Sequence, residues 1–222
     1  MINERTELVK DLVEFTGEPI EVIIPRILNG VYLMRYEWKT VNPTTVEEQK
    51  KFYKQTKNYL YDLTQWHFGN RREFDEELIK YLVELKKEKN QILKVLDFGC
   101  GIGQNSYMIV NAGVGEVTLA DLDSYTLSFA EHRFKKRSLP YKVWKTDVMS
   151  APQEKFDVIL AFDVFEHLSE EEYVDVVKTL MRLKAEDCKV FVQASYGSQN
   201  DSHPMHYEDS DIRKELLKKL LE

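Results

Sequence analysis

Residues 95–103 read Val-Leu-Asp-Phe-Gly-Cys-Gly-Ile-Gly, an apolar run that contains one acid and then has glycine at every second position. A helical pattern begins directly afterwards, at Gln104. Glycine lets a backbone turn sharply and approach a ligand closely, and Asp97 supplies a hydrogen-bond acceptor at the end of a strand. The stretch therefore predicts a strand, a loop that holds a small polar cofactor, and a helix. The alternative is a strand-to-helix turn that needs glycine only for its own geometry.

The first part of the chain reads differently. Residues 1–90 show amphipathic helical patterns and no strand alternation. We expect four helices, the second reaching Val31 with a boundary or bend at Pro25 and the third opened by residues 42–45 and extending to Trp66. The fourth is expected after Gly69-Asn70 and should end at about Lys89. These helices are expected to form a cap or lid, and residues 91–222 to form the cofactor-binding core.

From Ile92 onward, strand patterns alternate with helical patterns. Strands are expected at residues 93–98, 116–121, 141–144, 156–162 and 189–194, and a final helix at 212–221. This alternation predicts an α/β fold with a doubly wound, mostly parallel, Rossmann-like sheet, shortened to about five strands. The edge of the fifth strand should be covered by the cap helices, by the terminal helix or by a second copy of the chain, so a homodimer through that edge is one expectation.

Composition limits the class of protein. The chain has 222 residues, of which 43% are hydrophobic and 31% charged, which suits one globular unit with an appendage. Its formal net charge of -7 disfavours nucleic acid as a partner, although a basic run lies at residues 133–137. An apolar run of about 18 residues and a signal-peptide pattern are both missing, so we expect a cytoplasmic protein without membrane contact. Two cysteines without metal-ligand spacing are typical of a reducing compartment.

Acids follow two further strands of the expected sheet. Asp121 ends the second strand at the spacing expected of a carboxylate that accepts hydrogen bonds from ribose hydroxyls. Its alternative role is to cap the helix that begins near Ser124. Asp147 follows the third strand and is placed to receive an adenine amino group, or else to stabilise its own turn. Because ligands of parallel sheets bind beyond the carboxyl ends of strands, these acids and Asp97 should face one crevice.

Taken together, these segments resemble the class I S-adenosylmethionine-dependent methyltransferases, in particular the group that acts on small molecules. The resemblance covers roughly residues 92–195 and differs from the Gly-x-Gly-x-x-Gly of dinucleotide-binding dehydrogenases. It implies S-adenosylmethionine as the cofactor. The implied cofactor-binding residues are Asp97, Gly99, Cys100, Gly101 and Gly103 at the methionine part, Asp121 at the ribose, Leu122 and Val148 beside adenine, Asp147 at its amino group, and Phe162 and Asp163 on the methionine side.

The fourth strand leads into Phe162-Asp163-Val164-Phe165-Glu166-His167-Leu168, where the resemblance places the meeting of cofactor and acceptor. Glu166 and His167 are the candidate catalytic residues. A neutral imidazole takes up a proton near neutral pH, so His167 suits a general base. Its alternative role is to satisfy a loop carbonyl before the helix that starts after Ser169.

Candidate acceptor-binding residues come from two places. They are Tyr59, Trp66 and His67 on the aromatic third helix, and His203, His206 and Tyr207 in the loop after the fifth strand. The alternative role of these aromatic side chains is to pack the cap against the sheet. No metal site is expected, since the two histidines of the loop lack a third ligand nearby in the sequence.

The sequence therefore predicts a methyltransferase that moves a methyl group from S-adenosylmethionine to oxygen or nitrogen of a small molecule. An RNA or protein methyltransferase is the alternative within the same fold. A methyltransferase-like subunit with a regulatory or scaffolding role and a nicotinamide-dependent oxidoreductase are alternatives from other classes.

Overall fold

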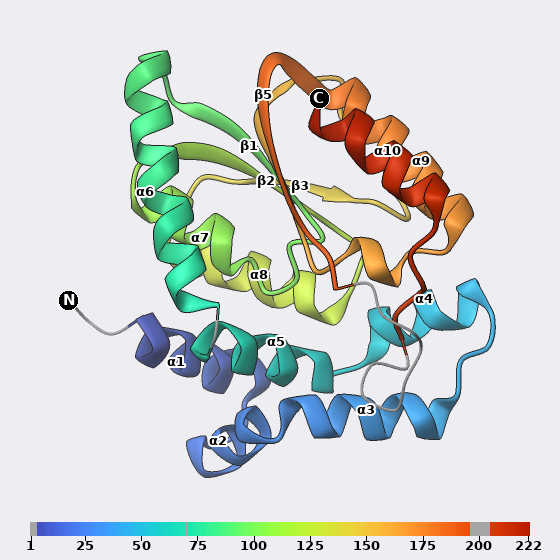
Figure 1. The fold of residues 1–222 in the computed structure, drawn as a ribbon. Coiled ribbons are helices and arrows are strands. Elements are labelled where there is room, and N and C mark those ends of the chain that lie inside the picture. Colours follow the sequence, from blue (N-terminus) through green and yellow to red (C-terminus); the bar gives the residue numbers. More distant parts are fainter. Residues whose placement is uncertain (1–3, 70, 196–204) are drawn as a thin grey trace.

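The computed structural model describes residues 4–69, 71–195 and 205–222. Its centre is a five-stranded sheet of β1 (Leu93–Phe98), β2 (Gly115–Asp121), β3 (Lys142–Lys145), β4 (Phe156–Phe162) and β5 (Lys184–Gln193). The strand order is β3-β2-β1-β4-β5, and every neighbouring pair is parallel (Figure 1). The expected α/β class with a short Rossmann-like sheet is confirmed.

Helices cover both faces of the sheet. Successive side chains of a strand point to opposite faces, and in these strands the side chains on both faces are apolar. Val95 packs with α6 (Arg72–Lys89), α7 (Gln104–Asn111) and α8 (Tyr125–Lys136). Leu96, its neighbour in the strand, packs instead with α9 (Glu170–Leu183) and α10 (Asp211–Leu221). Both side chains are fully buried. A strand that is apolar on both faces is what a parallel sheet between two helical layers requires.

Five helices lie across the carboxyl ends of the strands and form the cap: α1 (Glu4–Thr16), α2 (Ile20–Leu28), α3 (Gly30–Val41), α4 (Val46–Gln55) and α5 (Asn58–Phe68) (Figure 1). The helix from Arg72 to Lys89, expected in the cap, packs in the core cluster against the sheet. The cap in the structure therefore ends with α5.

Two boundaries within the cap differ from the sequence prediction. The expected second helix divides at Asn29, while Pro25, the expected boundary or bend, lies inside α2. The expected third helix divides at Thr56, whose backbone is extended at φ -65° and ψ 128°. Thr56 is 2% exposed and its hydroxyl donates to the Glu37 carboxylate at 2.6 Å. Tertiary contact with α3 thus fixes a break that the local sequence does not mark.

The cap is joined to the core by a buried ion pair between α1 and α8. Arg133 Nε lies 3.3 Å from Asp11 Oδ2, and these side chains are 1% and 0% exposed. Arg137 donates to the same carboxylate at 2.8 Å, and Lys136 pairs with Glu14. Three of the four basic residues of the run 133–137 are thus paired with acids of the cap, and the exposed Lys135 pairs with Glu131 of α8. The run therefore does not present an unpaired cationic surface.

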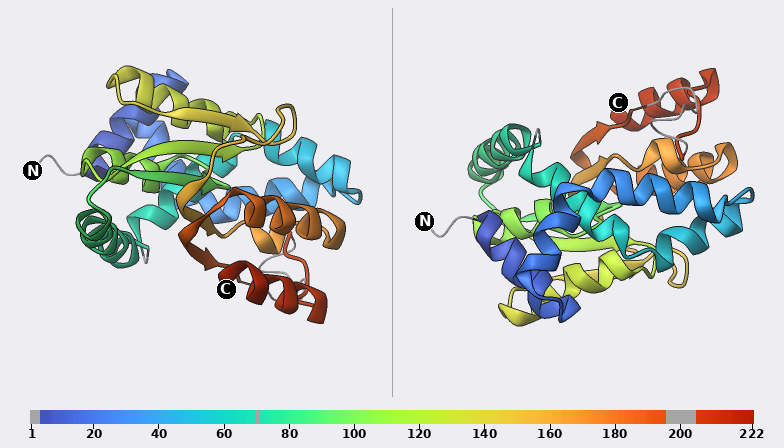
Figure 2. Two further views of the ribbon diagram at one scale, coloured as in Figure 1. Left: turned by 90° about the horizontal axis from the view of Figure 1, so that it is seen from above. Right: turned by 90° about the horizontal axis from the view of Figure 1, so that it is seen from below.

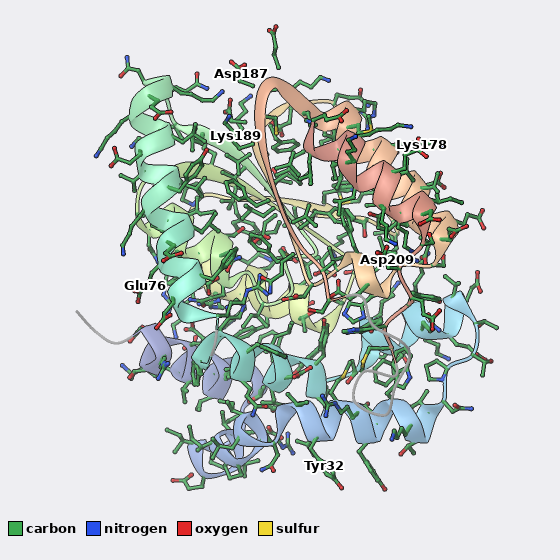
Figure 3. All side chains as sticks on the ribbon, viewed as in Figure 1. Tyr32, Glu76, Lys178, Asp187, Lys189 and Asp209 are labelled. Carbon is green, nitrogen blue, oxygen red and sulfur yellow. The ribbon has the colours of Figure 1, made fainter. Side chains whose placement is uncertain are left out.

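The fifth strand is the outer strand of the sheet. It begins at Lys184, five residues before the expected start, because Lys184 pairs with Phe156 at the beginning of β4. A register shift follows, and regular pairing resumes at Lys189, which lies opposite Val158. Asp187 marks the end of β5 that points away from the cap (Figure 3). The terminal helix α10 lies beside α9 and packs on the inner part of β5, where Leu220 is fully buried (Figure 2). Packing by the terminal helix was one of the three expected ways to cover this strand, and a homodimer through its edge stays a prediction.

Among the described residues, no helix combines the length and the apolar composition that crossing a bilayer demands.

Candidate active site

A cavity of about 520 Å³ lies between the cap and the carboxyl ends of the strands. Such a volume is within the range of small-molecule sites. The predicted site residues that line it are Asp97, Gly99, Cys100, Gly101, Asp121, Leu122, Asp147, Phe162 and Asp163 from the core loops, together with Tyr59, His67 and His167. The structure thus brings together one acid from each of four strand ends and side chains of the cap.

Some predicted residues lie elsewhere. Val148, expected beside adenine, is 60% exposed and does not line the cavity, whereas its neighbour Met149 does. Gly103 ends the loop as the N-cap of α7 and does not line the cavity; a Cβ added to it would lie 2.9 Å from the Cβ of Ala130 in α8. Trp66 is 45% exposed and borders only a smaller adjoining cavity. His203, also predicted to bind the acceptor, falls outside the described residues.

The glycine loop needs its glycines. Gly99, Gly101 and Gly103 have φ of 72°, 52° and 66°, in the left-handed region that side chains disfavour. A Cβ on Gly99 would lie 2.7 Å from the Cβ of Val164, in the loop after β4. The loop therefore needs glycine for its own geometry and also borders the cavity with bare backbone, while its contact with a cofactor stays a prediction.

Replacing Gly99 with Ala should destabilise the protein by about 1–3 kcal/mol more than replacing Gly113 with Ala, since only the first adds overpacking to the backbone penalty. Gly113 also has positive φ, at 62°, but a Cβ added there would have nothing within 4 Å. Urea unfolding of the two variants measures the difference. Equal losses would show that contact with Val164 does not restrict this loop.

Asp121 holds two backbone segments that line the cavity in place. Its Oδ2 accepts a hydrogen bond from Gly101 N and its Oδ1 one from Leu122 N, both at 2.7 Å. Ser124 caps α8 with its own side chain, which accepts from Leu127 N. The alternative that Asp121 caps this helix is therefore wrong. Burial raises the pKa of the Asp121 carboxyl to about 6.

Asp97 is a second buried acid that lines the cavity. It is 4% exposed, and its Oδ2 accepts from the Ser106 hydroxyl at 2.7 Å. Burial raises the pKa of this carboxyl also to about 6, and the hydrogen bond opposes that rise. A buried acid with one bonded oxygen is suited to accept from a polar ligand group.

Asp147 connects three segments. Its Oδ1 accepts from Asp123 N at 2.8 Å, and its Oδ2 accepts from Lys54 Nζ of α4 at 2.5 Å. The first contact stabilises the loop after β2, as the turn alternative requires, and the second joins the cap to the core. The carboxylate also borders the cavity, so its expected place beside adenine stays a prediction.

Arg71, directly before α6, is a site residue that the sequence analysis missed. Its guanidinium forms an ion pair with Asp163 and lies 4.9 Å from the ring centroid of Phe162. Its Nε lies 3.7 Å from Asp75 Oδ1, its Nη2 is buried without a hydrogen-bond partner, and the side chain borders both cavities. A buried guanidinium donor of this kind suits a carboxylate or another anionic group of a ligand. A single arginine in a polar turn gives no sequence signal for this role.

The loop after β4 meets the cap at His167. Its Nδ1 lies 2.9 Å from the Tyr53 hydroxyl, and its ring packs edge to face against His206 with centroids 4.8 Å apart. Glu166 is 1% exposed, and burial raises the pKa of its carboxyl. The two candidate catalytic residues thus lie together with one histidine of the distant loop. Only His167 borders the large cavity, whereas Glu166 and His206 border the smaller adjoining one.

The other predicted acceptor residues divide into two groups. Tyr59 and His67 border both cavities, and His67 Nδ1 lies 3.1 Å from Asp75 Oδ2. Tyr207 instead bonds Gln49 Oε1 through its hydroxyl at 2.7 Å. The aromatic residues of the cap likewise have two different roles. Tyr59 lines the cavities, whereas Tyr61 is 1% exposed and packs within the cap. Packing and cavity lining are thus both present on this face.

The sequence model of a family described as a methyltransferase domain matches residues 95–187, which hold the glycine loop, most of β1 and all of β2, β3 and β4. No curated protein sequence matches the chain.

Two solved structures illustrate the likeness in fold. WbdD, titled a bifunctional kinase-methyltransferase, is 17% identical with a TM-score of 0.55 over 75% of this chain and 39% of its own. N-methyltransferase NodS from Bradyrhizobium japonicum WM9, crystallised with S-adenosyl-L-homocysteine, is 17% identical with a TM-score of 0.51 over 66% of this chain and 74% of its own. The first four solved structures found are longer, and the chain spans 20% to 49% of them.

Residues 95–187 are thus similar in sequence to a methyltransferase domain, and the five-stranded parallel sheet is similar in fold to solved S-adenosylmethionine-dependent methyltransferases.

Proposed function

We propose that this protein transfers a methyl group from S-adenosylmethionine to an oxygen or nitrogen atom of a small-molecule acceptor. The observation that carries the proposal is the cavity that joins the glycine loop and Asp121 at one side to His167 and the cap at the other. Cofactor and acceptor would share this space, with the reacting atoms between β4 and the cap.

The residues present fit the cofactor. The left-handed glycines give a wall without side chains, Asp121 presents acceptors for two ribose hydroxyls, and Arg71 presents its buried Nη2 to the methionine carboxylate. S-adenosylmethionine supplies an activated methyl group on a sulfonium. What the protein has to contribute is the alignment of both partners and the exclusion of water.

The acceptor end adjoins a second cavity of about 100 Å³, which shares Tyr53, Tyr59 and His167 with the first. Burial raises the pKa of both tyrosines well above the usual value, so their hydroxyls stay protonated and can donate to an acceptor. The small volume and the overlying cap favour a small acceptor over RNA or protein. Pairing of Arg133, Lys136 and Arg137 with acids of the cap also disfavours RNA.

The experiment that tests the proposal is a methyl-transfer assay with labelled S-adenosylmethionine and separate sets of phenols, alcohols, amines, RNA and protein. We expect label in a small molecule, and no transfer by the Asp121→Ala variant. Label only in RNA or protein would overturn the acceptor class. S-adenosylmethionine binding without transfer to any set would favour the non-catalytic alternative, and binding of NAD in its place would favour an oxidoreductase.

Binding of S-adenosyl-L-homocysteine should weaken as the pH falls through about 6. Ribose hydroxyls donate to ionised Asp121, and burial places the pKa of that carboxyl, and of Asp97, at about 6. Both values lie above the usual carboxyl pKa, so protonation of these two groups favours the folded state, and their contribution to stability rises from pH 6 towards pH 4. Acid therefore weakens binding without a loss of folding from these groups. Calorimetric titrations between pH 5 and pH 8, at about half-unit steps, measure the effect, and a flat profile would contradict it.

A further inference from the structure

Three potential metal ligands meet at the acceptor end of the site. Glu166 and His167 belong to the short 3-10 helix Phe165–His167 after β4, and His206 lies in the segment that leads to α10. One ligand atom from each residue lies within 4.8 Å of the others. All three residues border the smaller cavity, next to Asp163.

The buried carboxylate of Glu166 has one oxygen that is suited to bind a cation. Its side chain is 1% exposed, and its Oε1 accepts from Ser195 N at 2.9 Å. Its Oε2 is buried and has no hydrogen-bond partner. A buried carboxylate oxygen without a donor is costly, so such an atom calls for a positive charge or a donor that a ligand supplies.

The two imidazoles have the orientation that metal ligands show. His206 Nδ1 lies 2.9 Å from the Ser195 carbonyl oxygen, which can only accept, so this nitrogen carries the proton. In the neutral ring the lone pair is then on Nε2. His167 Nδ1 lies 2.9 Å from the Tyr53 hydroxyl, which can fix that ring in the same way. Metal-bound histidines typically donate their other N–H to an oxygen in this manner.

We propose that Glu166, His167 and His206 bind one divalent transition-metal ion, such as Zn²⁺, that coordinates the acceptor oxygen at the methyl-transfer site. Two imidazoles and one carboxylate form a donor set that suits such an ion and leaves coordination positions for a ligand. Ligand atoms around bound zinc are about 3.3 Å apart, so the side chains have to approach by about 1.5 Å, a side-chain adjustment. This inference rests on the proposed function and specifies an oxygen acceptor.

The ion gives the cluster a defined part in the reaction. It lowers the pKa of a coordinated hydroxyl, which loses its proton to solvent. The oxygen then forms a bond to the methyl carbon while the carbon–sulfur bond breaks, and that electron pair stays on sulfur. The products are the methyl ether, S-adenosyl-L-homocysteine and one proton. Without an ion, His167 would itself take the proton, so metal binding separates the two mechanisms.

Metal binding is tested on the full chain after treatment with a chelator. Zn²⁺ is titrated by calorimetry, and Co²⁺ serves as a second probe through its visible absorption. The variants are Glu166→Gln, His167→Gln and His206→Gln, with His132→Gln as the matched control. His132 is a histidine of α8 that lies beside Glu14 of the cap and borders neither cavity.

We expect one Zn²⁺ per chain in the natural protein and in His132→Gln, and at least tenfold weaker binding in each of the other three. The Co²⁺ absorption should be lost in the same three variants. Absence of Zn²⁺ binding, or equal affinity in all variants, would overturn the proposal. If Glu166→Gln fails to fold, the Zn²⁺ affinity of His206→Gln tests the proposal. His206 lies outside the sheet, so its replacement should leave the core folded.

The same metal-free sample is titrated with S-adenosyl-L-homocysteine. Binding of this compound without any binding of Zn²⁺ would reject the metal site and leave the proposed function standing. Binding of Zn²⁺ at the three residues without binding of S-adenosyl-L-homocysteine would support the metal site and reject the proposed function.

Discussion

Replacing Asp121 with Asn should weaken binding of S-adenosyl-L-homocysteine by at least about a hundredfold. A hydrogen bond to a charged group contributes about 1.5–3 kcal/mol, and the ribose offers two hydroxyls to this carboxylate. Asn keeps the size of the side chain but exchanges one acceptor for a donor. In the structure both oxygens already accept backbone N–H groups of Gly101 and Leu122, so the amide also disturbs the loop.

Asp123→Asn is the matched control. Asp123 is two residues further along the same loop, and its side chain is 43% exposed and pairs with Lys145. Calorimetric titration should give natural affinity for this control, and urea unfolding should show that both variants are folded. Natural affinity in a folded Asp121→Asn protein would show that the ribose does not bind at the end of β2.

Replacing Arg133 with Met is expected to lower the free energy of unfolding by about 3–5 kcal/mol, since it leaves a buried carboxylate with less compensation. Arg133 is 1% exposed and bonds Asp11 of the cap, the Ile102 carbonyl oxygen of the glycine loop and Gln104 Oε1. One side chain thus connects the cap, the loop and α8. Met retains much of its apolar volume, so the loss reports on charge and hydrogen bonds.

Lys135→Met is the control for this change, on the same helix. The Lys135 side chain is 66% exposed and pairs with Glu131 four residues before it, a contact worth at most about 1 kcal/mol. Urea unfolding of the two variants compares them directly. Losses of similar size would mean that the α1–α8 ion pair does not hold the cap on the core.

The core of the fold could be predicted because its signals are local. β1 and β4 have the predicted bounds, since both are apolar runs that are buried on two faces and end at glycine or acid. Asp97, Asp121, Asp147 and Asp163 could be placed together because the carboxyl ends of parallel strands meet at one edge. These predictions depend on periodicity and topology alone.

Features that depend on tertiary contacts could not be predicted. The break at Thr56 depends on Glu37 of another helix, and Arg71 acquires its role only beside Asp163. Met149 lines the cavity where Val148 was expected, because one residue of difference in a loop turns a side chain to the other side. The sequence analysis expected no metal site because no third ligand lies near His206 in its own loop. Glu166, which the fold brings close to His206, is 40 residues away in the sequence.

A crystal structure of the full chain with S-adenosyl-L-homocysteine tests the central claim most directly. We predict density for the compound in the cavity between cap and sheet, with ribose hydroxyls within hydrogen-bond distance of Asp121 and the sulfur facing His167. Density at another place, or a protein that binds the compound without contact between its ribose and Asp121, would contradict the account.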